Sequence, residues 1–352
     1  MRAAIVLMDL DGVLIQPGGY RAAVAGSVRQ LIERMGMDAP IPSALVPALF
    51  ESIGITSEWD MVPVTLAILL NAVAEQTGKP LPNVSLPEIM LWVREQRIRH
   101  LAVDYENSVR ALKGLITTRV TPAYALFQIM RAGEVKFVFP HLKDQAFLFD
   151  LFEDTRDPAR SLTMRLVQSH VLGREVFEQT YGLPAEVQVE SLLLALDRPL
   201  LEARIRQRLR ALHQERVLRL CAFTARPSLP PVDGDFSASG YSPEAELALR
   251  LVDMADIPLM AYGRLIAFGK RYGVSPDSIL KPAALQSVAA VAAAVTGKEW
   301  AALEWAHAFV QASQAGERAP LLEGLPHAFD LHVFEDASVG IRGGQVAADL
   351  FR

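Results

Sequence analysis

Short apolar-rich runs occur at the start of the chain and again after residue 215. Each run is bounded by polar or turn-forming residues. Runs of this kind are typical of strands buried on both faces of a parallel sheet. They predict strands at residues 3–8, 216–224, 257–262 and 328–334.

The long segment between the first run and the second has a different pattern, because its apolar residues recur at helical spacing. It predicts helices at 24–35, 66–75, 88–100, 161–171, 187–195 and 199–213, with one short strand at 135–139. After residue 216, helices are predicted between the strands, at 243–255, 264–272, 281–295 and 299–315. Strands that alternate with helices indicate a doubly wound α/β domain.

Composition narrows the class of protein. With 352 residues, of which 51% are hydrophobic, the chain is expected to fold into two domains with a sizeable core. The formal charge of −5 argues against a nucleic-acid backbone as partner. The lone Cys221 excludes a disulfide framework. No signal peptide or membrane-spanning segment is recognisable, so we expect a cytoplasmic protein without a membrane partner.

Polar side chains gather where the predicted strands end. In open parallel sheets this edge is where ligands bind. Acidic groups that converge there would repel one another without a cation, and an all-oxygen ligand set suits Mg²⁺. The polar side chains expected at this edge are Asp9, Asp11, Thr224, Lys281, Glu335 and Asp336.

These residue types fit phosphoryl transfer. A carboxylate can attack phosphorus, and a hydroxyl such as that of Thr224 or an ammonium such as that of Lys281 can hold phosphoryl oxygens. A second carboxylate two residues further on can protonate the leaving alkoxide and then deprotonate water.

Each position also has a purely structural interpretation. Asp9 and Asp11 could bond to their own turn, and Thr224 could cap the turn that follows it. Lys281 could be a solvated helix start. Glu335 and Asp336 could form an N-cap pair favoured by the helix dipole.

Four motifs in order along the chain resemble those of the haloacid dehalogenase-like (HAD) hydrolase superfamily. They are Asp9-Leu10-Asp11-Gly12-Val13-Leu14, Phe223-Thr224-Ala225-Arg226-Pro227, Lys281-Pro282, and the segment 333–341 that contains Glu335-Asp336. The presence of Asp11 resembles the phosphatase and phosphomutase branch, because the dehalogenases of this superfamily lack that second carboxylate.

The resemblance implies a Rossmann-like parallel sheet core and a phosphorylated intermediate on Asp9, with acid/base work by Asp11. It implies phosphate binding by Thr224, Ala225 and Lys281. It also implies Mg²⁺ held by Asp9, by the main-chain carbonyl of Asp11 and by Asp336, with Glu335 close by.

The same resemblance implies the domain organisation. The core is expected at 1–16 and 215–352, and the large helical block 17–214 falls where the family inserts a C1-type cap. Relatives of this family normally continue for another helix and strand beyond the last motif, whereas this chain ends sixteen residues after Asp336.

The expected function is that of a Mg²⁺-dependent phosphatase acting on a small phosphorylated metabolite. Two alternatives stay open: a phosphomutase acting on a sugar phosphate, and a catalytically silent HAD-like protein used for binding. The sequence specifies neither the substrate nor the oligomeric state.

Overall fold

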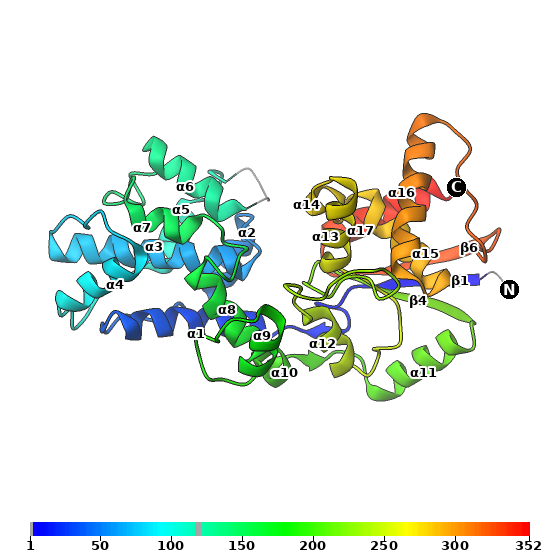
Figure 1. Ribbon diagram of the computed structural model, residues 1–352, viewed down its shortest axis with the longest axis horizontal. Helices are drawn as coiled ribbons and strands as arrows, with labels where there is room; N and C mark the ends of the chain where they lie inside the picture. Colours follow the sequence, from blue (N-terminus) through cyan, green and yellow to red (C-terminus); the bar gives the residue numbers. More distant parts are fainter. Residues whose placement is uncertain (1–2, 117–120) are drawn as a thin grey trace. The chain divides into compact units, whose positions relative to one another are not determined.

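The computed structural model describes residues 3–116 and 121–352. The chain divides into two compact units (Figure 1). Unit 1 combines Met1–Gly18 with Leu196–Arg352, and unit 2 is Gly19–Ala195. The second boundary differs from the expected one, because residues 196–214 belong to unit 1.

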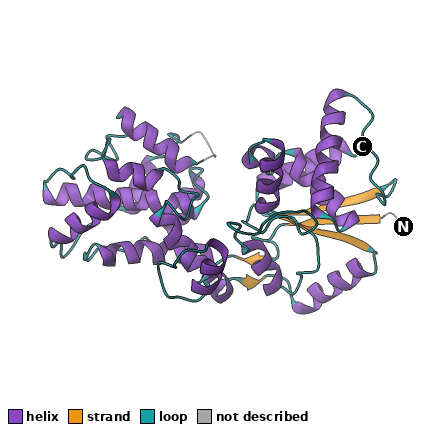
Figure 2. Cartoon of the chain, viewed as in Figure 1, coloured by secondary structure: helices purple, strands orange, loops and turns teal. Residues whose placement is uncertain are grey.

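Unit 1 is built on a four-stranded sheet whose neighbouring strands all run parallel, in the order β5-β4-β1-β6. The strands are β1 (Ala3–Met8), β4 (Leu218–Phe223), β5 (Leu259–Met260) and β6 (Phe329–Phe334). The α/β fold class predicted from the sequence is therefore confirmed, with a parallel sheet core and a large helical insertion (Figure 2).

The sheet is covered by helices on both faces. Side chains alternate along a strand, so Ile5 and Leu7 of β1 enter one core while Val6 and Met8 enter the other. The first core is closed mainly by α15 (Ala284–Thr296) and α16 (Glu299–Ala315). Two further helices, α13 (Tyr262–Tyr272) and α17 (Ser338–Leu350), also contribute to it. The second core is closed by α12 (Glu244–Leu251), with Leu209 of α11 (Ala203–Gln214) packed against it.

The remaining helix of unit 1 is α14 (Pro276–Ile279), which follows α13. A separate two-stranded ribbon, not predicted from the sequence, pairs β2 (Ile15–Gln16) antiparallel with β3 (Arg198–Pro199). This ribbon lies at the point where the chain leaves unit 1 and returns to it.

In the described part of unit 2, every element of regular secondary structure is a helix, and loops join the helices (Figure 2). Its helices are α1 (Gly19–Arg34), α2 (Leu45–Ser52), α3 (Glu58–Thr77), α4 (Leu86–Glu95), α5 (Tyr105–Ala111), α6 (Pro122–Ala132), α7 (Ala146–Phe152), α8 (Leu162–Leu172), α9 (Arg174–Tyr181) and α10 (Leu192–Leu196). α3 is almost wholly buried along its middle, begins at the N-cap Ser57 and ends at Gly78 in a left-handed conformation.

One predicted strand in this unit is wrong. Residues 135–139 form a turn that follows α6, with the amides of Val138 and Phe139 donating to the carbonyl of Val135. Gly133, at φ +77°, ends α6 just before it. Val135 and Phe139 are both buried, and their spacing of four residues places them on one side of a helical turn rather than of a strand.

Among the helices that the structure describes, none is both long and apolar enough to cross a lipid bilayer.

Candidate active site

The register of the sheet brings the polar strand ends together. Met8 of β1 lies opposite both Ala222 of β4 and Phe334 of β6, so the three strands end at the same level. The amide of Asp9 donates to the carbonyl of Phe334 over 3.0 Å and extends the pairing by one residue. The residues that follow these strands therefore emerge at one edge of the sheet.

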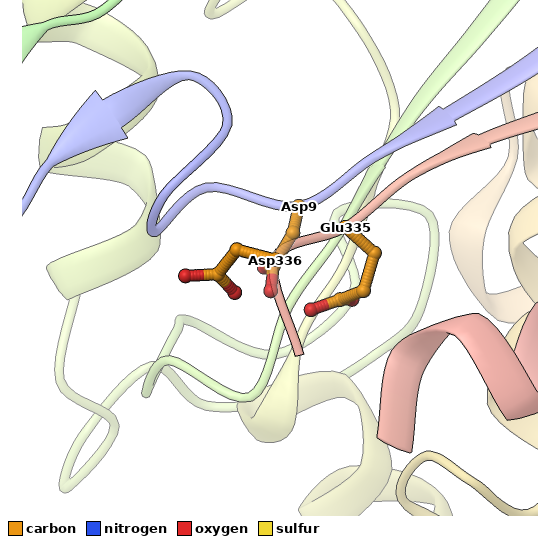
Figure 3. Close-up of side chains that lie close together, drawn as sticks. All are labelled: Asp9, Glu335 and Asp336. Carbon is orange, nitrogen blue, oxygen red and sulfur yellow. The ribbon is translucent and has the colours of Figure 1, made fainter. Parts of the chain in front are cut away.

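Three carboxylates meet at this edge. Each of Asp9, Glu335 and Asp336 offers an oxygen, and these oxygens all lie within 4.8 Å of one another. Figure 3 shows Asp9 at the end of β1 beside Glu335 and Asp336, which follow β6. Asp9 is buried, Glu335 is half-buried and Asp336 is exposed. Oxygen donors at this spacing can hold a metal ion.

Lys281 binds two of the three carboxylates. Its Nζ lies 2.7 Å from Oδ2 of Asp9 and 2.7 Å from Oε2 of Glu335, and it lies 4.8 Å from the ring centroid of Phe223. The side chain is buried, which disfavours the ammonium. The charges of Asp9 and Glu335 outweigh that cost and raise the pKa of Lys281 above its usual value. Lys281 is therefore a buried, charged group and not a solvated helix start.

The loop that carries Lys281 is fixed by Gln286 on α15. The fully buried amide of Gln286 accepts a bond from the amide of Lys281 over 2.8 Å. Its Nε2 donates to the carbonyls of Thr224 and Met260 at 2.9 and 3.1 Å. One side chain thus joins the Lys281 loop to the ends of β4 and β5.

Burial and neighbouring negative charge raise the pKa of two of these carboxylates. Burial and the charge of Asp9 raise the pKa of Glu335 to about 7, against the opposing effect of Lys281. Burial and the charges of Asp9 and Asp11 also raise the pKa of Asp336. Among the described residues, no cationic side chain forms an ion pair with Asp336. The cluster therefore carries more carboxylate than its own cations balance.

Asp11 lies next to this cluster and is paired with Arg226. The guanidinium donates through Nε to Oδ2 of Asp11 over 2.8 Å and through Nη2 to Oδ1 over 2.5 Å. Gly12 makes the turn after Asp11 possible, since its φ is +71° and a Cβ there would lie 2.0 Å from Oδ2 of Asp336. Only a glycine lets the chain pass so close to the acidic cluster.

Thr224 and Ala225 form the turn after β4. Thr224 is buried, and its Oγ1 accepts a bond from the amide of Arg226 over 3.2 Å. Ala225 is exposed. Of the three predicted phosphate-binding residues, Thr224 and Ala225 thus follow β4 directly. The third, Lys281, is linked to Thr224 through Gln286, which bonds to both.

Some of the purely structural interpretations are confirmed. Thr224 does cap its turn, and the amide of Leu10 donates to Oδ1 of Asp9 over 2.7 Å. Oε1 of Glu335 accepts a 3.3 Å bond from the amide of Ala337, the N-cap residue of α17. In each of Asp9, Thr224 and Glu335, the backbone bond occupies one side-chain oxygen and so restricts the orientation of the side chain.

Three residues of the site, Arg226, Asp197 and Gln286, were not predicted from the sequence. Arg226 stands in the second motif, but no role was assigned to it. Asp197 is buried and accepts a 2.9 Å bond from Nη2 of Arg226. Its only signal was its place in a short turn before Pro199, which is too weak to single it out. Gln286 likewise gave no signal within its alanine-rich helix.

Comparisons with known proteins add information on the fold. No protein-family model matches the chain, and no curated protein matches it. A crystal structure determined as a target of the Northeast Structural Genomics Consortium is similar, with a TM-score of 0.64, 14% identity, and coverage of 99% of this chain and 88% of that one. A second structure, entitled phosphatase Tt82 from Thermococcus thioreducens, has 14% identity over 98% of both chains. Its TM-score of 0.41 is too low to indicate a shared fold. The chain therefore shares the fold of the first structure.

Proposed function

We propose that this protein is a Mg²⁺-dependent phosphatase of the HAD type that hydrolyses a small phosphorylated metabolite through an aspartyl-phosphate. The observation that carries the proposal is the acidic cluster at the strand ends. Asp9, Glu335 and Asp336 bring oxygens within 4.8 Å of one another, and Lys281 binds Asp9 and Glu335 at 2.7 Å. The order of the four motifs along the chain supports it.

The donor set fits Mg²⁺. Asp9 and Asp336, with the main-chain carbonyl of Asp11 and Glu335 nearby, would supply only oxygen ligands, which this hard cation prefers. When bound, the ion would neutralise charge on the phosphoryl oxygens. The raised pKa values of Glu335 and Asp336 are consistent with a site that lacks one positive charge.

The reaction follows from the residues at this edge. A carboxylate oxygen of Asp9 forms a bond to phosphorus while the bond from phosphorus to the leaving oxygen breaks, and Asp11 donates its proton to that oxygen. Asp11 then takes a proton from water as the water oxygen attacks phosphorus and releases Asp9. Thr224, Ala225 and Lys281 hold the phosphoryl oxygens.

We infer that unit 2 selects the substrate, as the cap of a HAD-type enzyme would. The support for this is its position in the chain, because it is inserted between Gly18 and Leu196, after the first motif and before the second.

The test is phosphate release from an aryl phosphate by the full chain, measured with Mg²⁺ and with a chelator. We expect chelation to stop the reaction and Asp9→Asn to lower it by at least ~10³-fold, because the nucleophile is lost. Asp349→Asn is the matched control, since Asp349 is an exposed aspartate on α17 that pairs with Arg352. It should leave the rate unchanged.

Other outcomes would support the alternatives. Conversion of one sugar phosphate isomer into another, without free phosphate, would identify a phosphomutase. Indifference of a slow background rate to both the chelator and Asp9→Asn would contradict catalysis and favour a protein used for binding.

A further inference from the structure

Arg226 is a buried cation next to the proposed reaction centre for which the reaction described above has no use. Its side chain is 2% exposed and contacts two carboxylates. Toward Asp11 the contact is bidentate, with Nε on one oxygen and Nη2 on the other, at 2.8 and 2.5 Å. Nη2 also donates to Oδ2 of Asp197 over 2.9 Å.

The bidentate contact fixes Asp11 in a way that a single bond would not. Asp11 itself is 31% exposed, and it precedes a glycine at φ +71° in a tight turn. A carboxylate at such a position can otherwise rotate about its side-chain bonds. A planar guanidinium that grips both oxygens sets the plane and direction of the carboxylate. Each oxygen keeps a further lone pair for a proton or another partner.

Asp197 anchors Arg226 from the other side. It is buried with a side-chain exposure of 1%, and its Oδ1 accepts a bond from the amide of Gly18 over 2.9 Å. Gly18 ends the first segment of unit 1, and Asp197 stands near the start of the second. The two segments are also paired in the β2–β3 ribbon, where Gln16 lies opposite Arg198. The guanidinium is thus tied to both points at which the chain crosses between units.

We propose that Arg226 is a positioning residue that holds Asp11 in the orientation needed for proton transfer, and that Asp197 in turn holds Arg226. This inference rests on the proposed function. Proton transfer in the first step requires the Asp11 oxygen to lie within hydrogen-bonding reach of the leaving oxygen as the bond to phosphorus breaks. Misplacement of such a group by about 1 Å can cost about 10²-fold in rate.

The test uses two substrates that differ in their need for a proton. The phenolate of phenyl phosphate is a poor leaving group that must be protonated, whereas the dinitrophenolate of dinitrophenyl phosphate leaves as a stable anion. We expect Arg226→Gln to slow release from phenyl phosphate by about 10²-fold more than release from dinitrophenyl phosphate. A residue with only a structural role would lower both rates by the same factor.

Asp11 provides an internal control. Asp11→Asn should show the same selectivity, because it removes the proton donor itself. In the double variant, Arg226→Gln should then add no further selective loss, since there is no proton donor left to position. Arg226→Lys should keep most of the selective loss, because an ammonium cannot grip both oxygens.

Two further variants control for a general loss of structure. Arg264 is the matched control, as another buried arginine of unit 1 that contacts two carboxylates, Glu246 and Glu299. Arg264→Gln should show no selectivity between the substrates. If Arg226→Gln does not fold, Asp197→Asn keeps the shape of the anchor and should give a smaller loss of the same selectivity.

The outcomes separate the two proposals. Equal losses on both substrates in Arg226→Gln, or in Asp197→Asn where that variant replaces it, would overturn the positioning role and leave the phosphatase intact. A wild-type chain that releases phosphate from neither substrate would overturn the proposed function and this inference with it.

Discussion

Two of the buried cations of unit 1 that contact two carboxylates, Arg264 and Lys281, have different surroundings. Arg264 contacts Glu246 and Glu299, and Lys281 contacts Asp9 and Glu335. Both side chains are at most 5% exposed. The paired carboxylates of both clusters also accept backbone amide bonds, so the clusters differ in whether a further carboxylate lies beside them.

The cluster around Arg264 is closed. Glu299 accepts bonds from the amides of Leu259 and Val232 as well as from Arg264, and both oxygens of Glu246 accept from the amide of Leu229. Arg264 also donates to the carbonyl of Leu229 over 2.7 Å. Every carboxylate here has backbone partners, and the network fixes the loop after β4 against α16.

The cluster around Lys281 is open. It holds a third carboxylate, Asp336, which has no ion pair among the described side chains and whose pKa is raised by burial and by the charges of Asp9 and Asp11. A closed network stabilises a loop, whereas an open one with surplus negative charge favours an added cation. The comparison therefore distinguishes a structural ion cluster from a candidate metal site within one fold.

The largest effect on folding is expected at the closed cluster. Arg264→Gln leaves two buried carboxylates without their cation and should lower the free energy of unfolding by about 3–5 kcal/mol. Chemical denaturation measures this. An unchanged free energy of unfolding would show that the backbone bonds alone hold Glu246 and Glu299.

In metal-free protein, Asp336→Asn at the open cluster should not lower the stability, in contrast to Arg264→Gln. Removal of a carboxylate that is repelled by Asp9 and Asp11 should leave the melting temperature unchanged or raise it. With Mg²⁺ at about 100 times its dissociation constant, wild type should gain about 2.7 kcal/mol and the variant should gain much less. Scanning calorimetry of each protein, first with a chelator and then with Mg²⁺ in place of the chelator, gives both values. An equal Mg²⁺ effect in wild type and variant would place the ion elsewhere.

A smaller effect is expected from the pH dependence of Glu335 in the presence of a chelator. Its pKa is raised from 4.5 to about 7 in the folded protein, mainly by burial. Between these values the folded state keeps a proton that the unfolded chain has released, so stability falls as pH rises. Relative to Glu335→Gln, wild type should lose on the order of 2 kcal/mol between pH 4.5 and pH 7.

The measurement is the melting temperature of both proteins across this pH window. Parallel curves for wild type and Glu335→Gln would contradict the assignment of this slope to Glu335.

Much of this arrangement could be predicted because it depends on local pattern. The apolar run 3–8 coincides with β1, and 328–334 begins one residue before β6. Once the strands are parallel, polar residues that follow them must lie at one edge, so the convergence of Asp9, Glu335 and Asp336 followed from the order of the elements. Lys281 follows α14 and not a strand, so this argument does not place it.

The rest depends on contacts that local pattern does not encode. The ion pair between Arg226 and Asp11 joins residues 215 positions apart, and the partner of Arg226 on its other side lies beyond the helical insertion. The β2–β3 ribbon has only two residues in each strand, too few to show a period. Helix α11 resembled those of the insertion in its pattern, although its Leu209 packs against the sheet core.

The bond from Gly18 to Asp197 has a consequence for which insertions and deletions the chain can tolerate in evolution. The Gly18 amide at the outgoing end of the insertion lies 2.9 Å from Oδ1 of Asp197 at its returning end. For the sheet, everything between these two residues is therefore a single loop with joined ends. Closing a longer loop costs little additional entropy once its ends are joined. The segment between these ends can therefore lengthen, shorten or be exchanged for another with equally close termini, while the strand ends that carry the carboxylates keep their register.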